Sequence, residues 1–493
     1  MIRRAAYPAV PLYRGSTGNA AVSQLLWGDF VDITGPERDG RLPVRSRADG
    51  WMDKQDLQEE RLLEIVFVDI GQGDGMLMVT PDDDKLLIDA GEGDNMYRFL
   101  RWRFGKFRKK IEFSSVLISH GDADHWGGFS RLFEEPNLTF GTVYHNGLVE
   151  RADASGADEL GPRATSGAHQ LVTGVVSDDQ DMRRLLSDPT KVGRKRYAGL
   201  LRALLASGRA EQFQMLGRPV GQPSHLPGFG PDQELSMEIL GPVIERSGDA
   251  PALRWLGSVG QTKNGHSILL RLRYRDISVL LGGDLNTPSQ DLLLTTHTGL
   301  PSPASGPDAS ETLVTRAREV FRSDFAKACH HGSADFSSTF LAAVNPIAVV
   351  VSSGDEESYA HPRPDALGAY GQAGRGARPL IFSTELARSS AERIKYPNRY
   401  RDEILRIVDR IVAHQATGDD AARTTAREQL EQRLGDVDRS VAVYGAINLR
   451  TDGRRAVLAY RIEKPPRPDR RWDLYTFEPG PDGRLMYTGK SSR

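Results

Sequence analysis

The spacing of hydrophobic positions divides the chain into a short N-terminal part and a longer main part. In the first sixty or so residues, brief alternating runs at 22–26, 30–33 and 41–44 are separated by Gly and Pro. This spacing is typical of a small all-β module. From Leu63 onward, apolar runs of strand length alternate with stretches of helical periodicity. Such alternation predicts an α/β fold in which helices pack on sheets.

Apolar runs at 65–68, 75–79 and 86–88 predict a meander of strands. The segment 97–110 follows, and in it basic residues alternate with aromatic ones. That mixture serves phosphate contacts and base stacking in proteins that bind nucleic acid. An amphipathic helix, with its apolar stripe on the sheet and its basic face in water, predicts the same sequence. The pattern alone leaves both interpretations open.

The alternation is interrupted at about residues 146–260, a region rich in Gly, Ser, Asp and Arg. It contains one clear helix, at 196–207, and no clear strand before 236–240. Long insertions beside a site are often lids or specificity loops. A second insert, at 301–310, has the Pro/Ser/Ala composition of an exposed loop.

Near the C-terminus, a charged helical stretch at about 400–434 precedes two strands, at 441–449 and 455–463. The turn Thr451-Asp452-Gly453 predicts that these strands form a hairpin. We expect this region to complete the main fold and to add one helix to it. A separate C-terminal domain is the less economical alternative.

Residues with metal-binding chemistry are concentrated directly after the apolar run 116–118. His120, Asp122, Asp124 and His125 lie within six consecutive positions. Imidazoles and carboxylates placed together at a strand end become favourable when a divalent cation supplies the opposing charge. An Asp/His-rich surface turn is the alternative, but further clusters of ligand type favour a metal site.

Four such clusters follow, and each borders a strand-like apolar run. Strand ends that meet at one edge of a sheet are where α/β folds collect ligands and catalytic groups. We therefore expect one shared rim to carry the clusters Asn264-Gly265-His266-Ser267, Gly282-Gly283-Asp284, His330-His331-Gly332-Ser333 and Tyr359-Ala360-His361-Pro362.

In this order, the motifs resemble those of the metallo-β-lactamase superfamily, and within it the hydrolase domain of ComEC, the bacterial DNA-uptake channel. The resemblance spans about residues 64–386 with one long insertion and resumes at 443–448. It implies an αβ/βα sandwich and a hydrolase. The residues that carry it are V-D-I-G-Q-G-D at 68–74, L-I-D-A-G at 87–91, the metal motif at 120–125 with Gly127 and Gly128, Gly283-Asp284, and H-H-G-S at 330–333.

The resemblance also implies two divalent metal ions, Zn²⁺ or Mn²⁺. The second histidine of the superfamily motif is Asp122 here, as in the ComEC-like branch, so the site is richer in oxygen and accepts manganese as readily as zinc. His266 stands where the wider superfamily uses a histidine ligand and the ComEC-like pattern tends to have Asn. The implied ligands are His120, Asp122 and His266 for one ion, Asp124, His125 and His331 for the other, and Asp284 as the bridge.

Because adjacent residues leave a strand on opposite sides, only one of His330 and His331 is expected to be a ligand. We choose His331, with His330 as a proton donor to the leaving oxygen, and the reverse assignment stays open. Asp124 and Asp284 complete the expected catalytic set. Orientation of the ligands is expected of Asp69, Gln72, Asp74 and Asp89. Contact with substrate is expected of Ser333, Tyr359 and His361. Weaker candidates for reaching the metals are His145, His169 and His225.

Composition agrees with an ordinary globular enzyme. Charged residues make up 26% of the 493 positions and the net charge is -2. The composition therefore lacks the strong basic excess that by itself would indicate nucleic-acid binding. Cys329 is the single cysteine, which excludes an intrachain disulfide and fits a reducing compartment; we expect it to be a small buried residue. No segment has the length of a membrane span or the apolar core of a signal peptide, so we expect a cytoplasmic protein without membrane insertion.

Three hypotheses remain for the function. The first is a phosphodiesterase or nuclease that acts on DNA, RNA or nucleotides, because the resemblance points to a nuclease and two-metal sites suit phosphoryl displacement. The second is hydrolysis of a small ester, lactam or choline-phosphate substrate. The third is a binding protein with a structural metal, which the complete ligand set disfavours.

We expect three regions along the chain. Residues 1–60 resemble a bacterial SH3-like barrel through W-G-D-F-V at 27–31 and D-G-W-M at 49–52; such a module either binds a peptide or protein ligand or braces the main fold. Residues 61–463 form the hydrolase domain. Residues 464–493 form an extension packed on it.

Overall fold

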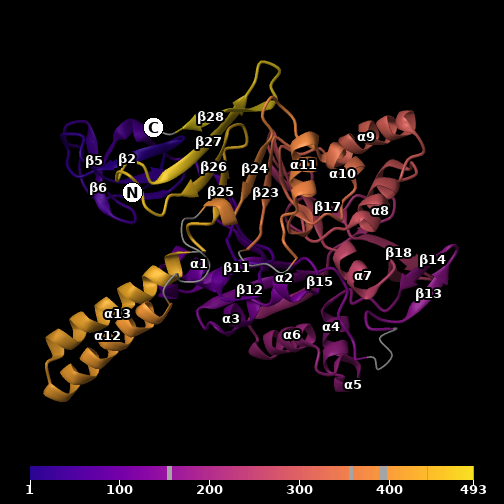
Figure 1. Ribbon diagram of the computed structural model, residues 1–493, viewed down its shortest axis with the longest axis horizontal. Helices are drawn as coiled ribbons and strands as arrows, with labels where there is room; N and C mark the ends of the chain where they lie inside the picture. The colour runs from indigo at the N-terminus through magenta and orange to yellow at the C-terminus, as the bar shows by residue number, and fades with distance from the viewer. Residues whose placement is uncertain (153–157, 355–358, 388–396, 441, 492–493) are drawn as a thin grey trace.

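Two large β-sheets form the centre of the molecule (Figure 1). The computed structural model describes residues 1–152, 158–354, 359–387, 397–440 and 442–491. The larger sheet has ten strands in the order β15-β12-β11-β10-β9-β8-β25-β26-β27-β28, and the smaller has six in the order β17-β20-β21-β22-β23-β24.

The ten strands are β8 (Leu63–Phe67), β9 (Gly75–Val79), β10 (Lys85–Ala90), β11 (Ile111–Ile118), β12 (Leu138–His145), β15 (Ala210–Met215), β25 (Ile447–Thr451), β26 (Ala456–Arg461), β27 (Trp472–Pro479) and β28 (Leu485–Ser491). The six are β17 (Leu235–Gly241), β20 (Leu269–Tyr274), β21 (Ile277–Gly282), β22 (Phe325–Lys327), β23 (Ala348–Val351) and β24 (Leu380–Ser383).

Alternation along the strands gives each sheet two buried faces. Ile65 of β8 belongs to the same core as Leu272 of β20, so the two sheets pack face to face. Val66, the next residue of β8, belongs instead to a core shared with helices on the other side of the larger sheet. Those helices are α1 (Asn95–Arg103), α2 (Ala123–Trp126), α3 (Phe129–Glu134), α4 (Asp179–Leu186), α5 (Pro189–Val192) and α6 (Arg196–Ser207).

The smaller sheet is covered by helices on its outer face too, so the layers run helix, sheet, sheet, helix. Leu269 and Leu280 share a buried core with Phe321 and Phe340 of the covering helices. This arrangement of layers confirms the predicted αβ/βα sandwich. The covering helices are α8 (Thr287–Thr298), α9 (Pro307–Phe321), α10 (Ser338–Val344) and α11 (Pro364–Ala373).

The N-terminal residues form the predicted all-β module, a sheet of seven strands in the order β3-β2-β6-β5-β4-β1-β7. Trp27 packs with Val457 and Leu474 of the larger sheet, and Asp29 pairs with the buried Arg450 at 2.8 Å. The module is therefore joined to the sandwich by a buried interface. Its strands are β1 (Ile2–Ala5), β2 (Ala9–Tyr13), β3 (Ala21–Leu26), β4 (Phe30–Ile33), β5 (Arg41–Arg45), β6 (Asp49–Asp53) and β7 (Leu57–Gln58), with the 3₁₀ turn η1 (Lys54–Asp56).

The insertion is more structured than the sequence predicted. The helix expected at 196–207 is confirmed as α6, but the prediction of no strand before 236 was wrong. The missed strands are short and half exposed, so they carry little hydrophobic alternation. A small five-stranded sheet holds β13 (Arg163–Ser166), β14 (His169–Val172), β19 (Ala250–Arg254), β18 (Val243–Ser247) and β16 (Arg218–Pro219), and α7 (Val259–Gly265) leads from it back to the six-stranded sheet.

The charged stretch near the C-terminus is two helices rather than the predicted one. α12 (Pro397–Thr417) and α13 (Asp420–Ser440) pack against each other and project away from the sandwich, with the break at Gly418, whose φ is 72° (Figure 1). The hairpin predicted around Asp452 is confirmed by β25 and β26. Its first strand begins at Ile447, later than predicted, because residues 442–446 are not strand, and Val441 lies outside the described residues. β27 and β28 continue the larger sheet beyond residue 463.

The insert predicted as a loop at 301–310 is irregular only as far as Gly306, because α9 begins at Pro307, where proline is favoured in a first helical turn. None of the helices in the described ranges is both long and apolar enough to cross a membrane.

Candidate metal centre

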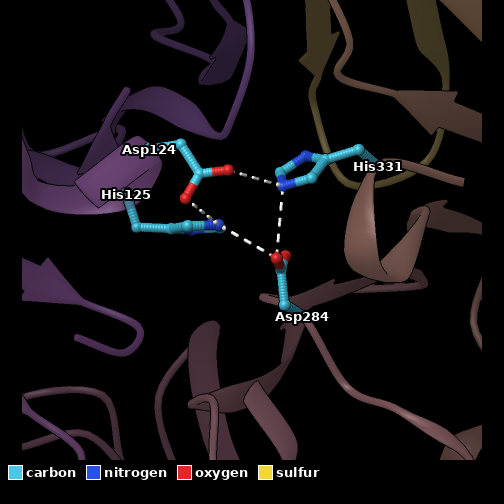
Figure 2. Close-up of side chains that lie close together, drawn as sticks. All are labelled: Asp124, His125, Asp284 and His331. Atoms are coloured by element: carbon cyan, nitrogen blue, oxygen red, sulfur yellow. Dashed lines mark ion pairs between the residues drawn. The ribbon is translucent and has the colours of Figure 1, made fainter. Parts of the chain in front are cut away.

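Four side chains from three strand ends meet at one edge of the sandwich (Figure 2). Asp284 follows β21, and its Oδ2 atom lies 3.3 Å from His125 Nε2 and 3.2 Å from His331 Nε2. Asp124, at the start of α2 after β11, lies 3.5 Å from His331 Nε2 through Oδ2. Their ligand-type atoms all lie within 4.8 Å of one another. We call Asp124, His125, Asp284 and His331 the compact cluster.

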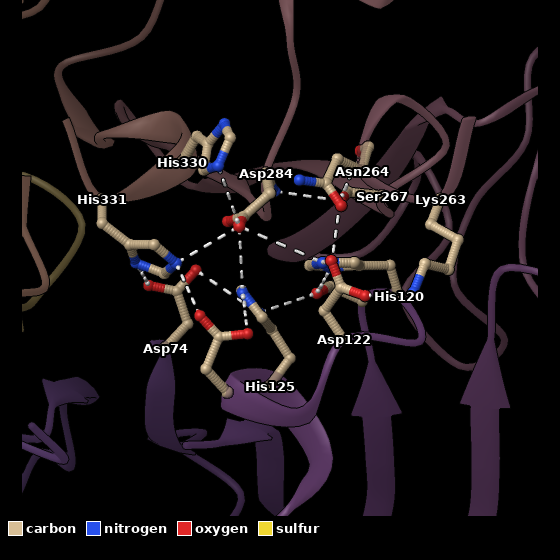
Figure 3. Close-up of polar contacts among 12 residues, drawn as sticks. Asp74, His120, Asp122, His125, Lys263, Asn264, Ser267, Asp284, His330 and His331 are labelled. Atoms are coloured by element: carbon tan, nitrogen blue, oxygen red, sulfur yellow. Dashed lines mark hydrogen bonds and ion pairs between the residues drawn. The ribbon is translucent and has the colours of Figure 1, made fainter. Parts of the chain in front are cut away.

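Asp284 also faces a second, looser group of side chains (Figure 3). Its Oδ2 atom lies 4.0 Å from His120 Nε2 and 3.8 Å from His330 Nε2. His120 Nε2 in turn lies 3.6 Å from Asp122 Oδ2. One carboxylate oxygen thus stands between four imidazoles, which is the central position expected of a bridging ligand.

The donor atoms fit a divalent cation. Among the described residues, Nε2 of His120, His125 and His331 and Oδ1 of Asp284 are buried and have no hydrogen-bond partner. A buried polar atom without a partner costs about 1–3 kcal/mol. Imidazole nitrogens and carboxylate oxygens are ligands for both zinc and manganese, so a cation bound here would satisfy these atoms.

Hydrogen bonds at the far side of each ring direct Nε2 toward the cluster. His125 Nδ1 lies 2.8 Å from Asp89 Oδ2, and Asp89 Oδ1 also accepts the backbone N–H of Ser119 at 2.7 Å. His331 Nδ1 lies 3.2 Å from the carbonyl oxygen of Ser352 and 3.4 Å from Asp74 Oδ1. Asp89 and Asp74 thus lie where the expected role of orienting ligands requires them.

The other two residues expected to orient ligands lie in the loop between β8 and β9. Asp69 is fully buried and accepts the backbone N–H of Gly71 at 3.3 Å. A Cβ atom on Gly445 would lie 1.9 Å from Asp69 Oδ2, so the loop packs tightly on the segment before β25. Gln72 is half-buried in the same loop. The contacts of Asp69 thus stabilise the loop that carries Asp74.

Two lysines that the sequence analysis did not select also contact the site. Lys327, from β22, forms an ion pair with Asp74, and both side chains are 1% exposed. Lys263, from the last turn of α7, lies 2.5 Å from Asp122 Oδ1 and 2.7 Å from Glu150 Oε1 (Figure 3). Asp74 and Asp122 thus each have a cationic side chain as a partner within the protein. No local motif marks these lysines, because each reaches the site from a separate element.

The carboxylates dominate the electrostatics of the compact cluster. Burial disfavours a charged imidazole, but Asp284 and the other nearby carboxylates outweigh it and hold the pKa of both His125 and His331 well above the usual value. For Asp124, burial is likewise outweighed by the two histidines, which lower its pKa to about 2. The cluster therefore attracts positive charge, whether from protons or from a metal ion.

His330 differs from its neighbour. Its side chain is 25% exposed, whereas His331 is 3% exposed. Burial and the neighbouring histidines, opposed by Asp284, lower the pKa of His330, so its imidazole is neutral at pH 7. The two residues adopt left-handed φ values of 48° and 53° in the 3₁₀ turn η3 (Cys329–Gly332), which is unusual for residues other than glycine and directs both rings toward Asp284.

The structure differs from the prediction at His266. Its Nε2 atom donates a hydrogen bond to the carbonyl oxygen of Arg254 at 2.6 Å, and burial lowers the pKa of His266 to about 4. The place expected for it beside Asp122 is taken by Lys263 and by Asn264, whose amide nitrogen, turned toward Asp122, donates to Oδ2 at 2.8 Å. Ser267 lies closer to the ligands, with Oγ 3.2 Å from His120 Nδ1.

The three weaker candidates are not part of the cluster. His145 is fully buried at the end of β12, where its Nδ1 atom accepts the backbone N–H of Gly147 and burial lowers its pKa to about 4. His169 is exposed on β14, in the small sheet of the insertion. His225 forms a β-bridge with Glu238.

The residues expected to contact substrate lie beside His330. The rings of His361 and His330 have centroids 5.5 Å apart, and Tyr359 stacks on His361 at 5.9 Å. Tyr359 is 66% exposed, so this pair of rings leads from His330, beside the compact cluster, to the surface. Ser333 follows η3 directly and donates its backbone N–H to the carbonyl oxygen of His330 at 2.8 Å.

Cys329 precedes the paired histidines, and it is partly buried rather than fully buried as expected. Burial, together with the negative charge of Asp284 and Asp74, raises the pKa of its thiol to about 12, although Lys327 opposes this. A thiol with a raised pKa is protonated at neutral pH, which disfavours a role for Cys329 as a nucleophile.

Comparisons with known proteins gave distant similarities to solved structures only. Neither a family model nor a curated protein matches the chain. The metallo hydrolase Igni18 of the archaeon Ignicoccus hospitalis is 12% identical, with 64% of this chain and 96% of that chain covered and a TM-score of 0.30. A putative metal-dependent hydrolase of Parabacteroides distasonis is 10% identical, with coverages of 65% and 92% and a TM-score of 0.27. The subclass B3 metallo-β-lactamase MEM-A1, from a soil metagenome library, is 15% identical, with coverages of 54% and 81% and a TM-score of 0.24. TM-scores this low do not by themselves establish a shared fold.

Proposed function

We propose that this protein is a metal-dependent hydrolase of the metallo-β-lactamase superfamily, of the ComEC-like branch, and that it cleaves phosphodiesters in DNA, RNA or nucleotides. The observation that carries the proposal is the position of Asp284, whose Oδ2 atom lies within 4.0 Å of Nε2 of four histidines. Support also comes from the order of the motifs along the chain, which places each ligand-type residue at the end of a strand.

The compact cluster would hold one divalent ion, and His120 and Asp122 would hold a second ion that shares Asp284. Such ions, zinc or manganese, supply positive charge that polarises a phosphoryl oxygen and acidifies an attacking water. The chain's own contribution is to fix the donor atoms. Asp89 and Asp74 hold the rings of His125 and His331, so little rearrangement is needed when an ion binds.

His330 is the residue suited to moving a proton. It is neutral, its Nε2 atom points to Asp284, and it is more exposed than the histidines of the compact cluster. It can accept a proton at Nε2 from the attacking water and return it to the leaving oxygen. The stacked rings of Tyr359 and His361 beside it offer a flat surface against which a base or sugar can pack.

Hydrolysis assays with matched variants test this proposal. The purified protein, with manganese or zinc, is incubated with single- and double-stranded DNA and RNA, with cyclic and linear dinucleotides, and with small ester, lactam and choline-phosphate substrates. Asp284→Ala removes the central carboxylate. Asp276→Ala is the matched control, because Asp276 is 74% exposed on the turn between β20 and β21.

We expect metal-dependent cleavage of a phosphodiester by the wild type and by Asp276→Ala, and none by Asp284→Ala. Cleavage of polymers would identify a nuclease, and turnover of dinucleotides alone would identify a smaller phosphodiester substrate. Turnover of only the ester, lactam or choline-phosphate substrates would refute the phosphodiester assignment and favour the alternative. Equal activity in Asp284→Ala would refute the proposed site.

A further inference from the structure

A pocket of about 330 Å³ lies where the N-terminal module meets the sandwich, and it shares no residue with the metal centre. The turn between β5 and β6 supplies Arg47, helix α1 supplies Trp102 and Arg103, and strands β25–β27 supply Arg450, Arg461 and Trp472. Its volume is at the lower end of the range of about 300–1,000 Å³ that is usual for small-molecule sites. Three parts of the chain far apart in sequence thus form one concave surface.

The pocket carries more positive than negative charge. Four arginines and two carboxylates, Asp29 and Glu64, line it. The carboxylates are held by two of the arginines, because Glu64 lies 3.1 Å from Arg103 and Asp29 lies 2.8 Å from Arg450. Counted over its lining residues alone, the pocket therefore has two more arginines than carboxylates.

Arg47 is the side chain best placed to receive an anion. Its guanidinium makes no hydrogen bond or ion pair with any residue in the described part of the chain, and its central carbon lies 3.8 Å from the centroid of the Trp102 ring. The neighbouring Arg103 adds positive charge beside it, so an anion at this guanidinium would be favoured.

Aromatic rings form another part of the wall. Trp102 and Trp472 are half-buried, and Phe30, which also lines the pocket, is 47% exposed. The guanidinium of Arg461 lies 5.3 Å from the Trp102 ring and 5.9 Å from the Trp472 ring. Guanidinium groups and aromatic rings within one small cavity are the combination that recognises a phosphate attached to a planar base.

The buried face of α1 explains the alternation of basic and aromatic residues only in part. Met96, Phe99 and Leu100 are its buried residues, which confirms the amphipathic helix predicted within the segment 97–110. Trp102 and Arg103, at the end of the same helix, line the pocket. We infer that this pocket binds a nucleotide, either free or as one unit of a single strand, with its phosphate at Arg47 and Arg461 and its base against the aromatic wall.

Binding to the metal-free protein tests this inference separately from hydrolysis. After chelation of metals, the full-length protein is titrated with AMP, with adenosine, with inorganic phosphate and with a short single-stranded oligonucleotide. Isothermal calorimetry and tryptophan fluorescence report binding, since Trp102 and Trp472 line the pocket. We expect AMP or the oligonucleotide to bind and to alter the fluorescence, and adenosine and phosphate alone to bind more weakly.

Arg47→Ala should weaken the binding about tenfold or more, because a charge-assisted hydrogen bond is lost. Arg47 lies on an exposed turn, so the variant should fold, and Arg461→Gln is the second variant. Arg45→Ala is the matched control, since Arg45 is exposed and pairs with Asp49 at the same hairpin.

Tighter binding of the oligonucleotide than of AMP would identify a strand as the source of the nucleotide, and the reverse would identify a free nucleotide. Absence of binding by every ligand, or equal affinity in Arg47→Ala and the wild type, would overturn the inference. Metals are removed and turnover is not measured in this experiment. Failure to bind would therefore not argue against the proposed hydrolase activity, and absence of hydrolysis would not argue against binding in this pocket.

Discussion

Replacing Lys263 by methionine would show whether the lysine ammonium group takes the place of a metal ion beside Asp122. Lys263 Nζ lies 2.5 Å from Asp122 Oδ1 and 2.7 Å from Glu150 Oε1, and its side chain is 14% exposed. Methionine keeps the length of the side chain and removes the charge. The variant would leave Asp122 and Glu150 facing each other across a partly buried space without a cation between them.

The exposures set the expected size of the effect. Removing one partner of a fully buried ion pair costs about 3–5 kcal/mol, whereas an exposed pair contributes about 0–1 kcal/mol. Asp122 is 30% exposed and Glu150 is 17% exposed, so the pair lies between these limits but nearer the buried one. We expect the free energy of unfolding of the metal-free protein to fall by about 2–3 kcal/mol.

Metal ions should reverse this loss. A divalent ion at His120 and Asp122 would supply the positive charge that the Lys263→Met variant lacks, so manganese or zinc should stabilise the variant more than the wild type. In the wild type, a second ion has to compete with Lys263 for Asp122. We therefore expect calorimetric titration to show one tight and one weak ion in the wild type, and a tighter second ion in the variant.

Urea unfolding with and without metal, and metal content after gel filtration, measure these quantities. Lys54→Met is the matched control, because Lys54 is 72% exposed and its pair with Glu37 is at the surface. If Lys263→Met is as stable as the wild type without metal, and its stability responds to metal to the same extent, Lys263 does not act as an internal cation and the reasoning fails.

Three further outcomes are expected. Burial opposes ionisation of Glu64, but Arg103 and Arg450 outweigh it and lower its pKa to about 2. The ionised Glu64 should therefore stabilise the fold by about 3 kcal/mol, an effect that is complete above pH 4.5 and is lost as the pH falls toward 2. In urea unfolding, wild type and Glu64→Gln should thus differ far more at pH 7 than at pH 3. Gly73→Ala should release bound metal, since φ there is 103° and a Cβ atom would lie 1.8 Å from the carbonyl oxygen of the metal-binding turn; a normal metal content would contradict this. Cys329 should react only slowly with thiol reagents at pH 8, because the pKa of its thiol is about 12, and Cys329→Ala should keep its metal; rapid labelling of folded protein would show otherwise.

The compact cluster could be predicted from the sequence because each of its residues belongs to a local motif at a strand end. Asp124 and His125 lie in the turn after β11, Asp284 follows β21, and His331 follows β22. The order of strands in the smaller sheet then brings β21 and β22 side by side as parallel neighbours, so their carboxyl ends meet. Hydrophobic periodicity and polar strand ends made these residues candidates, and the resemblance to the metallo-β-lactamase superfamily implied that they act as one set.

The environment of Asp122 could not be predicted in the same way. His266, Asn264 and Lys263 are close in sequence, and which of them reaches Asp122 depends on how α7 is rotated. His266 is held instead at the end of β19, where the carbonyl oxygen of Arg254 accepts the N–H of its ring. β19 lies in the insertion, whose short and half-exposed strands carry no clear periodicity. The misplacement of His266 therefore has the same cause as the missed strands.

The positions of Lys263 and Lys327 also determine which carboxylates are available to bind a metal ion. Within the part of the chain that the structure describes, two groups of three or more His, Asp or Glu residues have ligand atoms within 4.8 Å of one another: the compact cluster and a second group of Asp74, Asp89 and His125. In the second group, Asp74 already pairs with Lys327, and both are buried away from water, so a metal there would have to share the carboxylate with an ammonium group. The compact cluster contains no such lysine pair among the contacts described, and its buried Nε2 atoms have no hydrogen-bond partner there. We therefore expect the first and tightest ion at Asp124, His125, Asp284 and His331, a conclusion that the positions of the lysines supply and the ligand motifs alone do not.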